Sequence, residues 1–99
     1  MAWRRFSAGG LTIDVQFGDP TLLVVIGNVY ADRRSALREA LEAAAGWPGS
    51  PDIEVNLVLA RFQDDVAWSD LLAAQDSCKD QGRRFTMTFG GRAKLAAIN

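Results

Sequence analysis

Segments with helical periodicity alternate with strand segments along most of this chain, and that order leaves few folds open. Residues 11–17 alternate apolar and polar side chains, as a strand with one solvated face does. Apolar residues recur at helical spacing over 33–45 and 66–81, and Gly46 and Gly82 mark the ends of these two helices. The expected strands cover 11–17, 21–26, 53–59 and 84–89, and the expected helices cover 33–45, 66–81 and 92–98.

This order predicts an α/β fold. Helices between strands require right-handed crossovers, which make the strands parallel after the opening hairpin. We therefore expect a four-stranded mixed sheet, an opening hairpin followed by parallel crossovers, packed with helices. The apolar run 22–26 indicates a central strand that is buried on both faces. We treat residues 1–99 as a single domain, and we leave open that 1–9 form a flexible N-terminus.

The helical segments also predict caps and faces. Asp32 offers an N-cap to the first helix. On the second helix, Asp70 is expected to point away from the core. The residues expected on its inner face are Trp68, Leu71, Leu72, Gln75 and Cys78.

Composition excludes several classes of function. The chain has 11 Lys and Arg against 12 Asp and Glu, so no basic excess favours nucleic acid. Histidine is absent and Cys78 is the single cysteine, which removes nucleophile–histidine pairs and cysteine-based zinc sites. No apolar run reaches the roughly 18–20 residues of a membrane span, and the N-terminus lacks a signal peptide's apolar region. We expect a cytoplasmic protein with no cofactor, no nucleic-acid partner and no membrane association.

The best candidate site is the run from Phe62 to Asp65, between the third strand and the second helix. In a parallel sheet this loop lies at the carboxyl end of a strand, where ligands and partners bind such folds. The carboxylates of Asp64 and Asp65 also have a structural interpretation, because either one can cap the helix that follows. An enzymatic alternative is a receiver-like Mg²⁺ site, but it needs a lysine at the end of the last strand, and none is present there. We expect no enzyme activity.

The run from Val55 to Gln75 resembles the central motif of STAS domains, which are the anti-sigma-factor antagonists and the related domain of sulfate transporters. That motif reads roughly Leu-Asp-Leu-Ser-Gly-Val-x-Phe-Ile-Asp-Ser-Ser-Gly-Leu-x-x-Leu-Leu, and it aligns here without a gap. A second match lies in the Gly-Glu-Leu-Asp stretch that closes the family's second strand. The matched residues are Phe62, Asp64, Leu71 and Leu72 in the first motif, and Gly27 and Val29 in the second.

The departures from the family motif concern its regulatory switch. The family's phosphorylated serine falls on Asp65, and the next serine falls on Val66. In the family, a kinase that is also the anti-sigma factor phosphorylates this serine and thereby weakens the complex. A phosphoserine carries about −1.5 to −2 charges and Asp carries one, so Asp65 is an imperfect, permanent mimic of the modified state. The family's Asp in the third strand is replaced by Asn56.

The resemblance implies a protein-binding regulatory module. It would dock on a kinase-like anti-sigma factor or another signalling protein, and Asp65 implies either weak binding or a partner adapted to a constant charge. The alternative is a structural or regulatory subunit of a transporter or signalling assembly that is not phosphorylated. In either case the sheet edge is available to a partner or to a second copy of the chain. The residues expected to bind the partner are Asn28, Tyr30, Asp32, Gln63, Asp64, Asp65 and Trp68.

Overall fold

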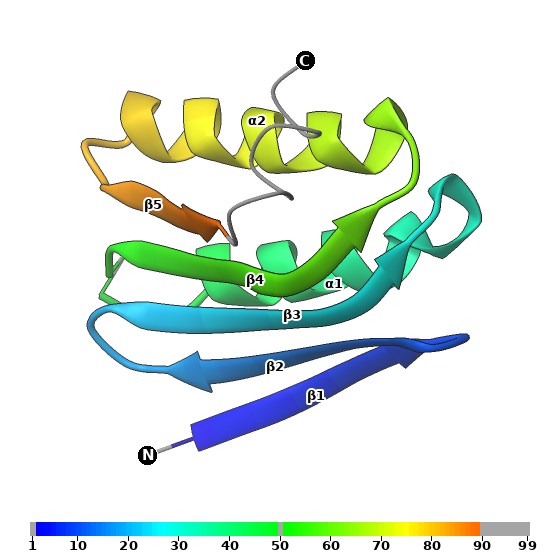
Figure 1. Cartoon of the computed structure of the whole chain (residues 1–99). Coiled ribbons are helices and arrows are strands. Elements are labelled where there is room, and N and C mark those ends of the chain that lie inside the picture. The colour runs from blue at the N-terminus through cyan, green and yellow to red at the C-terminus, as the bar shows by residue number, and fades with distance from the viewer. Residues whose placement is uncertain (1, 50, 90–99) are drawn as a thin grey trace.

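The computed structural model describes residues 2–49 and 51–89. These residues form one mixed five-stranded sheet in the order β1-β2-β3-β4-β5, with two helices (Figure 1). The first three strands are antiparallel neighbours, and β3, β4 and β5 are parallel. The elements are β1 (Ala2–Ala8), β2 (Leu11–Phe17), β3 (Thr21–Val29), the 3₁₀ turn η1 (Ala31–Arg33), α1 (Arg34–Ala45), β4 (Ile53–Phe62), α2 (Asp65–Asp80) and β5 (Phe85–Phe89).

The α/β class and the mixed sheet are confirmed, with one strand more than the four expected. The additional strand is β1, in which residues 2–8 pair with β2, within the segment 1–9 that the sequence left open as an N-terminal extension. The β1–β2 hairpin turns at Gly9 and Gly10, whose φ angles of 43° and 85° are those that a tight two-residue hairpin loop requires. The expected terminal helix at 92–98 lies outside the described residues.

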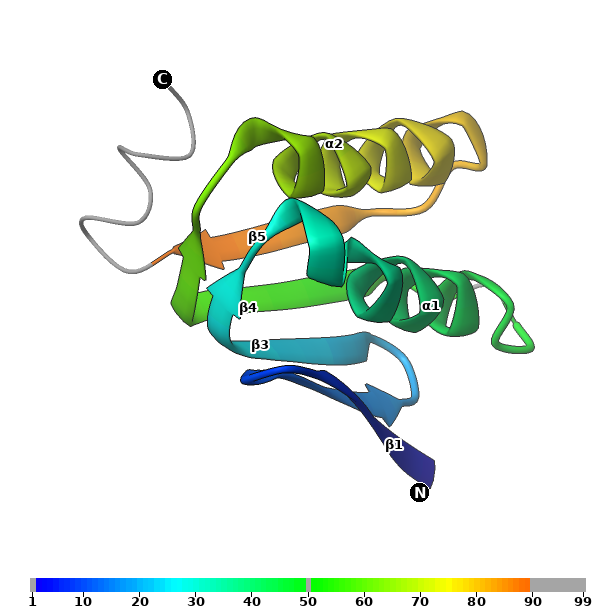
Figure 2. The ribbon, with the colours of Figure 1, turned by 90° about the vertical axis from the view of Figure 1, so that its right-hand side faces the viewer.

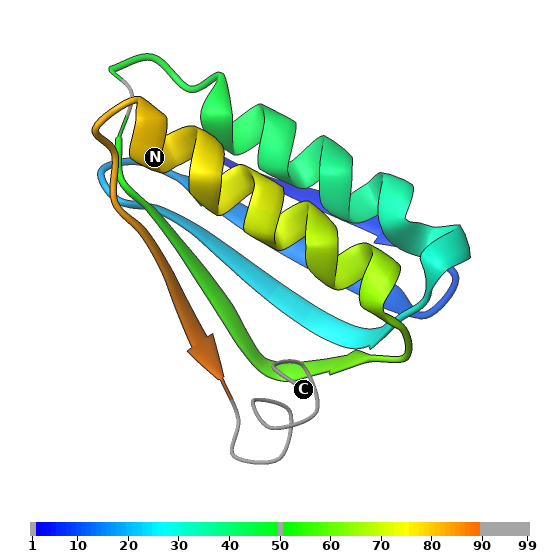
Figure 3. The ribbon, with the colours of Figure 1, turned by 90° about the horizontal axis from the view of Figure 1, so that it is seen from above.

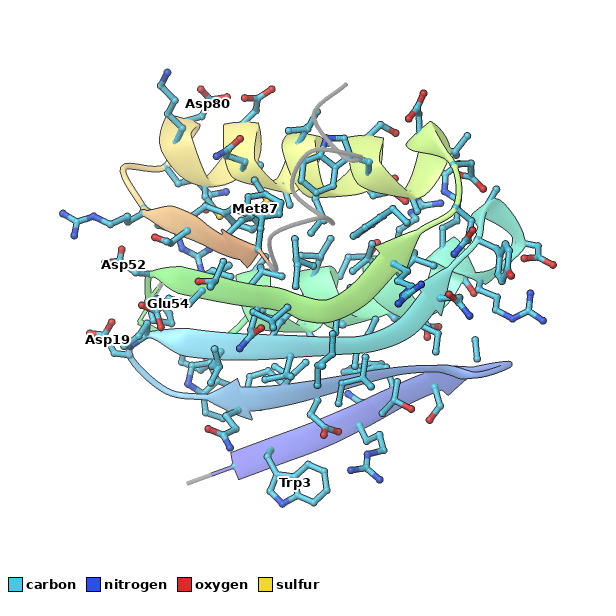
Figure 4. All side chains as sticks on the ribbon, viewed as in Figure 1. Trp3, Asp19, Asp52, Glu54, Asp80 and Met87 are labelled. Carbon is cyan, nitrogen blue, oxygen red and sulfur yellow. The ribbon has the colours of Figure 1, made fainter. Side chains whose placement is uncertain are left out.

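Both helices cover the same face of the sheet, and the core lies between them and that face (Figure 2). Leu23 and Val25 of β3 point into this core and are fully buried, whereas Ile26 on the opposite face is 37% exposed. The prediction that the run 22–26 is buried on both faces was therefore wrong, since no described element covers the second face. Figure 4 shows Trp3 on β1 at the edge of the sheet, where it is 62% exposed.

The helices differ from the predictions at three residues. Asp32 does not cap α1, because it lies inside η1 and the helix begins only after Arg33, which makes no capping hydrogen bond. Leu72 is 41% exposed and points away from the core, unlike Leu71, which is fully buried. Asp70 was expected to point outward but instead pairs with Arg34 of the neighbouring helix. In the described part of the chain, no helix is long and apolar enough to cross a membrane.

The ion pair between α1 and α2 gives a first testable result. Arg34 donates from Nε and Nη2 to the two carboxylate oxygens of Asp70, each at 3.0 Å, and the Asp70 side chain is only 13% exposed. A double-mutant cycle with Arg34→Met and Asp70→Asn should give a coupling energy of about 0.5–1 kcal/mol, since the pair is bidentate but borders solvent. The coupling should shrink in 1 M salt, as followed by urea unfolding. A coupling of zero at low salt would show that the pair does not join the helices.

Candidate functional site

The candidate site lies where β3 and β4 end side by side. The two parallel strands remain paired up to Val29 and Phe62, and the amide of Gln63 then donates to the carbonyl of Val29 at 3.0 Å. The chain after β3 enters η1, and the chain after β4 enters α2. We call the surface formed by residues 28–32 and 63–66 the strand-end face; it faces the viewer in Figure 2.

Asp64 joins the two halves of the strand-end face. Its Oδ1 accepts from the amide of Val66 at 3.1 Å, which caps the N-terminus of α2. Its Oδ2 accepts from the amide of Ala31 at 2.8 Å, across 33 residues of sequence. The capping interpretation of the Asp64–Asp65 pair is therefore correct for Asp64. Both of its carboxylate oxygens bond within the domain, so its role in a binding face is to position the loops.

A second contact joins the halves nearer the solvent. Gln63 Nε2 donates to Asn28 Oδ1 at 3.0 Å, and both residues are exposed. These two residues were predicted separately as partner contacts, and the structure brings them together. Their remaining amide atoms face solvent and can hydrogen-bond to another protein.

Arg33 shapes the side of the face formed by η1. Its guanidinium lies 5.5 Å from the centre of the Tyr30 ring, pairs with Asp32 at 2.8 Å and donates to the carbonyl of Gly9 at 2.8 Å. Arg33 thereby links η1 to the β1–β2 turn. Tyr30 remains 41% exposed, as a surface aromatic suited to contact does.

The first turn of α2 completes the strand-end face. Asp65 is exposed as the first residue of the helix, where its negative charge is favourable to the helix dipole. Val66 beside it is 41% exposed. Trp68 was predicted to contact a partner, but it is half-buried and its ring packs against Phe62 and Phe89, with centres 5.3 and 5.5 Å away. Its described contacts are therefore internal.

Sequence reasoning missed Val66 and Arg33. Val66 stands where the resembled motif has a second serine, and an apolar residue at that place was the available signal. For Arg33 no local signal exists, because its contact with Gly9 depends on the β1–β2 turn.

Asn56, which replaces an Asp of the motif, accepts a hydrogen bond from the amide of Val58 at 3.0 Å, where the β3–β4 register shifts. Its role is local to β4.

Gly27 allows the end of β3 to pass close to the β1–β2 turn. Its φ of 108° lies in a region that side chains rarely adopt, and a Cβ there would meet the carbonyl oxygen of Gly10. The contact sets how closely the segment before η1 approaches Gly9, which Arg33 then binds. The Gly27 matched to the STAS motif is therefore required by backbone packing.

The described residues hold no group of three or more His, Cys, Asp or Glu side chains placed to bind a metal ion. A receiver-like site would need a third acid beside Asp64 and Asp65. Asp64 is also engaged by two amides, which leaves fewer lone pairs for a cation.

Comparison with known proteins identifies the fold. No protein-family model matches the sequence, and no curated protein gives a significant match. A solved structure of an anti-sigma-factor antagonist, a STAS domain from Rhodobacter sphaeroides, is similar with a TM-score of 0.57. The alignment covers 89% of each chain at 16% identity. This chain has the fold of a STAS domain.

The likeness to the STAS domain spans most of both chains. The resemblance inferred from residues 55–75 is therefore confirmed at the level of fold.

The single cysteine gives a second testable result, because its thiol is buried. Cys78 is 3% exposed on the inner side of α2, as predicted, and burial raises the pKa of its thiol. A thiol reagent at pH 8 should modify the folded chain at least about tenfold more slowly than the chain unfolded in urea. Equal rates in the two states would show that Cys78 is accessible and reactive.

Proposed function

We propose that this chain is a regulatory STAS-like module that acts in the cytoplasm by binding a signalling protein, and that this protein is a kinase-like anti-sigma factor. The observation that carries the proposal is the double hydrogen bond of Asp64, which holds the loops after β3 and β4 as one surface. A preorganised surface loses little conformational entropy on binding. The module has no catalytic activity of its own in this account.

The strand-end face supplies the usual elements of a protein contact. Tyr30 and Val66 are each 41% exposed, and they are the apolar part of the surface. The exposed polar groups around them are Asn28, Gln63 and Asp65. An aromatic anchor surrounded by polar groups is typical of binding surfaces at which a few residues carry most of the affinity.

Asp65 supports a partner adapted to a constant negative charge. Its carboxylate is exposed and accepts no hydrogen bond from the described side chains, so it is available to a cationic group of the partner. Where the resembled family has a serine, phosphorylation alters the charge; here the charge is fixed. Binding should therefore not depend on ATP or on the kinase activity of the partner.

The test compares the charge at residue 65 with a matched charge elsewhere on α2. The tagged chain captures its partner from native cells, and the recovered anti-sigma factor is then purified and titrated. Asp65→Asn should weaken binding about three- to tenfold at low salt, and less at high salt, as expected for an exposed charge at an interface. Asp76→Asn, on the same helix but outside the strand-end face, should leave the affinity unchanged.

Two results would contradict the proposal. If only transporter or assembly subunits are recovered, and residue 65 has no effect, the chain is a structural STAS-like subunit. If an anti-sigma factor binds with equal affinity to Asp65→Asn and to the original chain, Asp65 lies outside the interface. A second copy at the sheet edge stays a prediction, to be checked by sedimentation of the isolated chain.

A further inference from the structure

A groove of about 410 Å³ lies between α1 and α2, and none of its lining residues belongs to the strand-end face. Figure 3 shows the two helices side by side above the sheet. The volume is within the range of about 300–1,000 Å³ that is usual for small-molecule sites. The groove takes no part in the function proposed above.

Arg83 lines this groove and is 93% buried, since its exposed fraction is 7%. Its Nε donates to the carbonyl of Pro51 at 2.9 Å, and its Nη1 donates to the carbonyl of Ala45 and to Gln81 Oε1 at 3.2 Å each. The remaining nitrogen, Nη2, is buried without a hydrogen-bond partner among the described residues. A buried donor without an acceptor costs free energy, so Arg83 is held in this position by its other bonds and its packing.

The charges around the groove favour an anion. Arg34 and Asp70, which both line it, neutralise each other in a bidentate pair. Arg38 and Arg83 line it as well, and in the described part of the chain no carboxylate lies within 4 Å of either guanidinium. Glu42 is the one remaining carboxylate of the lining, so the groove keeps a net positive charge of one.

Part of the wall is apolar. Leu41 and Ala45 of α1 face Ala74 and Cys78 of α2 across the groove. Such a wall binds hydrocarbon. A ligand that satisfies both parts of the site has one anionic head and one apolar body.

We propose that the groove between α1 and α2 binds a small organic carboxylate, with its carboxylate oxygens near Arg83 and its hydrocarbon body between the two helices. The charge of the carboxylate balances the positive charge that Arg38 and Arg83 leave in the lining. Phosphorylation, nucleic acid and the strand-end face have no part in this site. If the groove binds no carboxylate, the proposed binding of a signalling protein at the strand-end face is unaffected.

The test uses octanoate as the probe, with 1-octanol and octylammonium of the same chain length as controls. Titration of the full chain by calorimetry should show saturable binding of one octanoate per molecule. Binding of octanol and octylammonium should be at least tenfold weaker. Amide resonances of Ala45, Ala74 and Cys78 should shift with octanoate, while those of residues 28–32 should not. Absence of saturable binding, or equal binding of octanol, would overturn the proposal.

Two pairs of variants locate the probe without disturbing the side-chain bonds of Arg83. Ser77 is an exposed residue of α2 that lines the groove, and Asp76 beside it does not line it. Ser77→Phe should reduce octanoate affinity at least tenfold by filling the groove, whereas Asp76→Phe should leave it unchanged. Arg38→Gln should weaken octanoate binding at least threefold, and Arg84→Gln, outside the groove, should not. Equal effects within either pair would place octanoate elsewhere.

Discussion

Gly27→Ala is expected to lower the free energy of unfolding by about 3 kcal/mol. Part of the loss is the cost of placing a side chain at a φ of 108°. The rest comes from the new Cβ, which would meet the backbone carbonyl oxygen of Gly10 and so has no flexible neighbour to displace. Urea unfolding followed by circular dichroism measures the change.

Gly49 is the matched control. Its φ of 90° is similar, but a Cβ at this position would meet nothing within 4 Å. Gly49→Ala should therefore cost only the backbone part, about 1–2 kcal/mol. If both substitutions cost the same, the close approach of β3 to the β1–β2 turn is not a constraint on the fold.

Asp64→Ala is expected to cost about 2–4 kcal/mol. Loss of the helix cap accounts for about 1 kcal/mol. The amide of Ala31, which is partly buried, loses its acceptor and adds about 1–3 kcal/mol. Asp64→Asn should cost less than Asp64→Ala, because an amide can replace one acceptor oxygen but not both.

Asp65→Ala is the control for Asp64→Ala. Asp65 is adjacent and exposed, and it contributes through the helix dipole alone, so its loss should cost about 0.3–1 kcal/mol. Thermal and urea unfolding of both variants measure the difference. Equal costs would mean that Asp64 is a surface carboxylate and does not join the loops.

Local patterns in the sequence predict most elements of this fold. Alternation over 11–17 and helical spacing over 33–45 and 66–81 correspond to β2, α1 and α2, with ends shifted by one residue or so. The missed strand is β1, whose Arg4 and Arg5 interrupt a simple apolar pattern at a solvent-exposed edge. Gly9 and Gly10 were the available signal, because paired glycines are typical of hairpin turns.

The candidate site could be predicted only in part, because its contacts join distant segments. A carboxylate before a helix predicts the cap made by Asp64, but its bond to Ala31 requires β3 and β4 to be neighbours. Asp70 was assigned to solvent from the period of its own helix, and Arg34 of α1 reversed that assignment. Tertiary contacts decide such cases, and local periodicity does not contain them.

The most direct test of the central claim, that the strand-end face binds the partner, compares two exposed apolar residues on different surfaces. Tyr30 lies on the strand-end face, and Leu59 lies on the open face of the sheet, where it is 62% exposed. Affinity for the purified anti-sigma factor is measured by calorimetry for Tyr30→Ala and Leu59→Ser. The account predicts at least a tenfold loss for Tyr30→Ala and no change for Leu59→Ser. A loss for Leu59→Ser with none for Tyr30→Ala would contradict it and move the interface to the sheet.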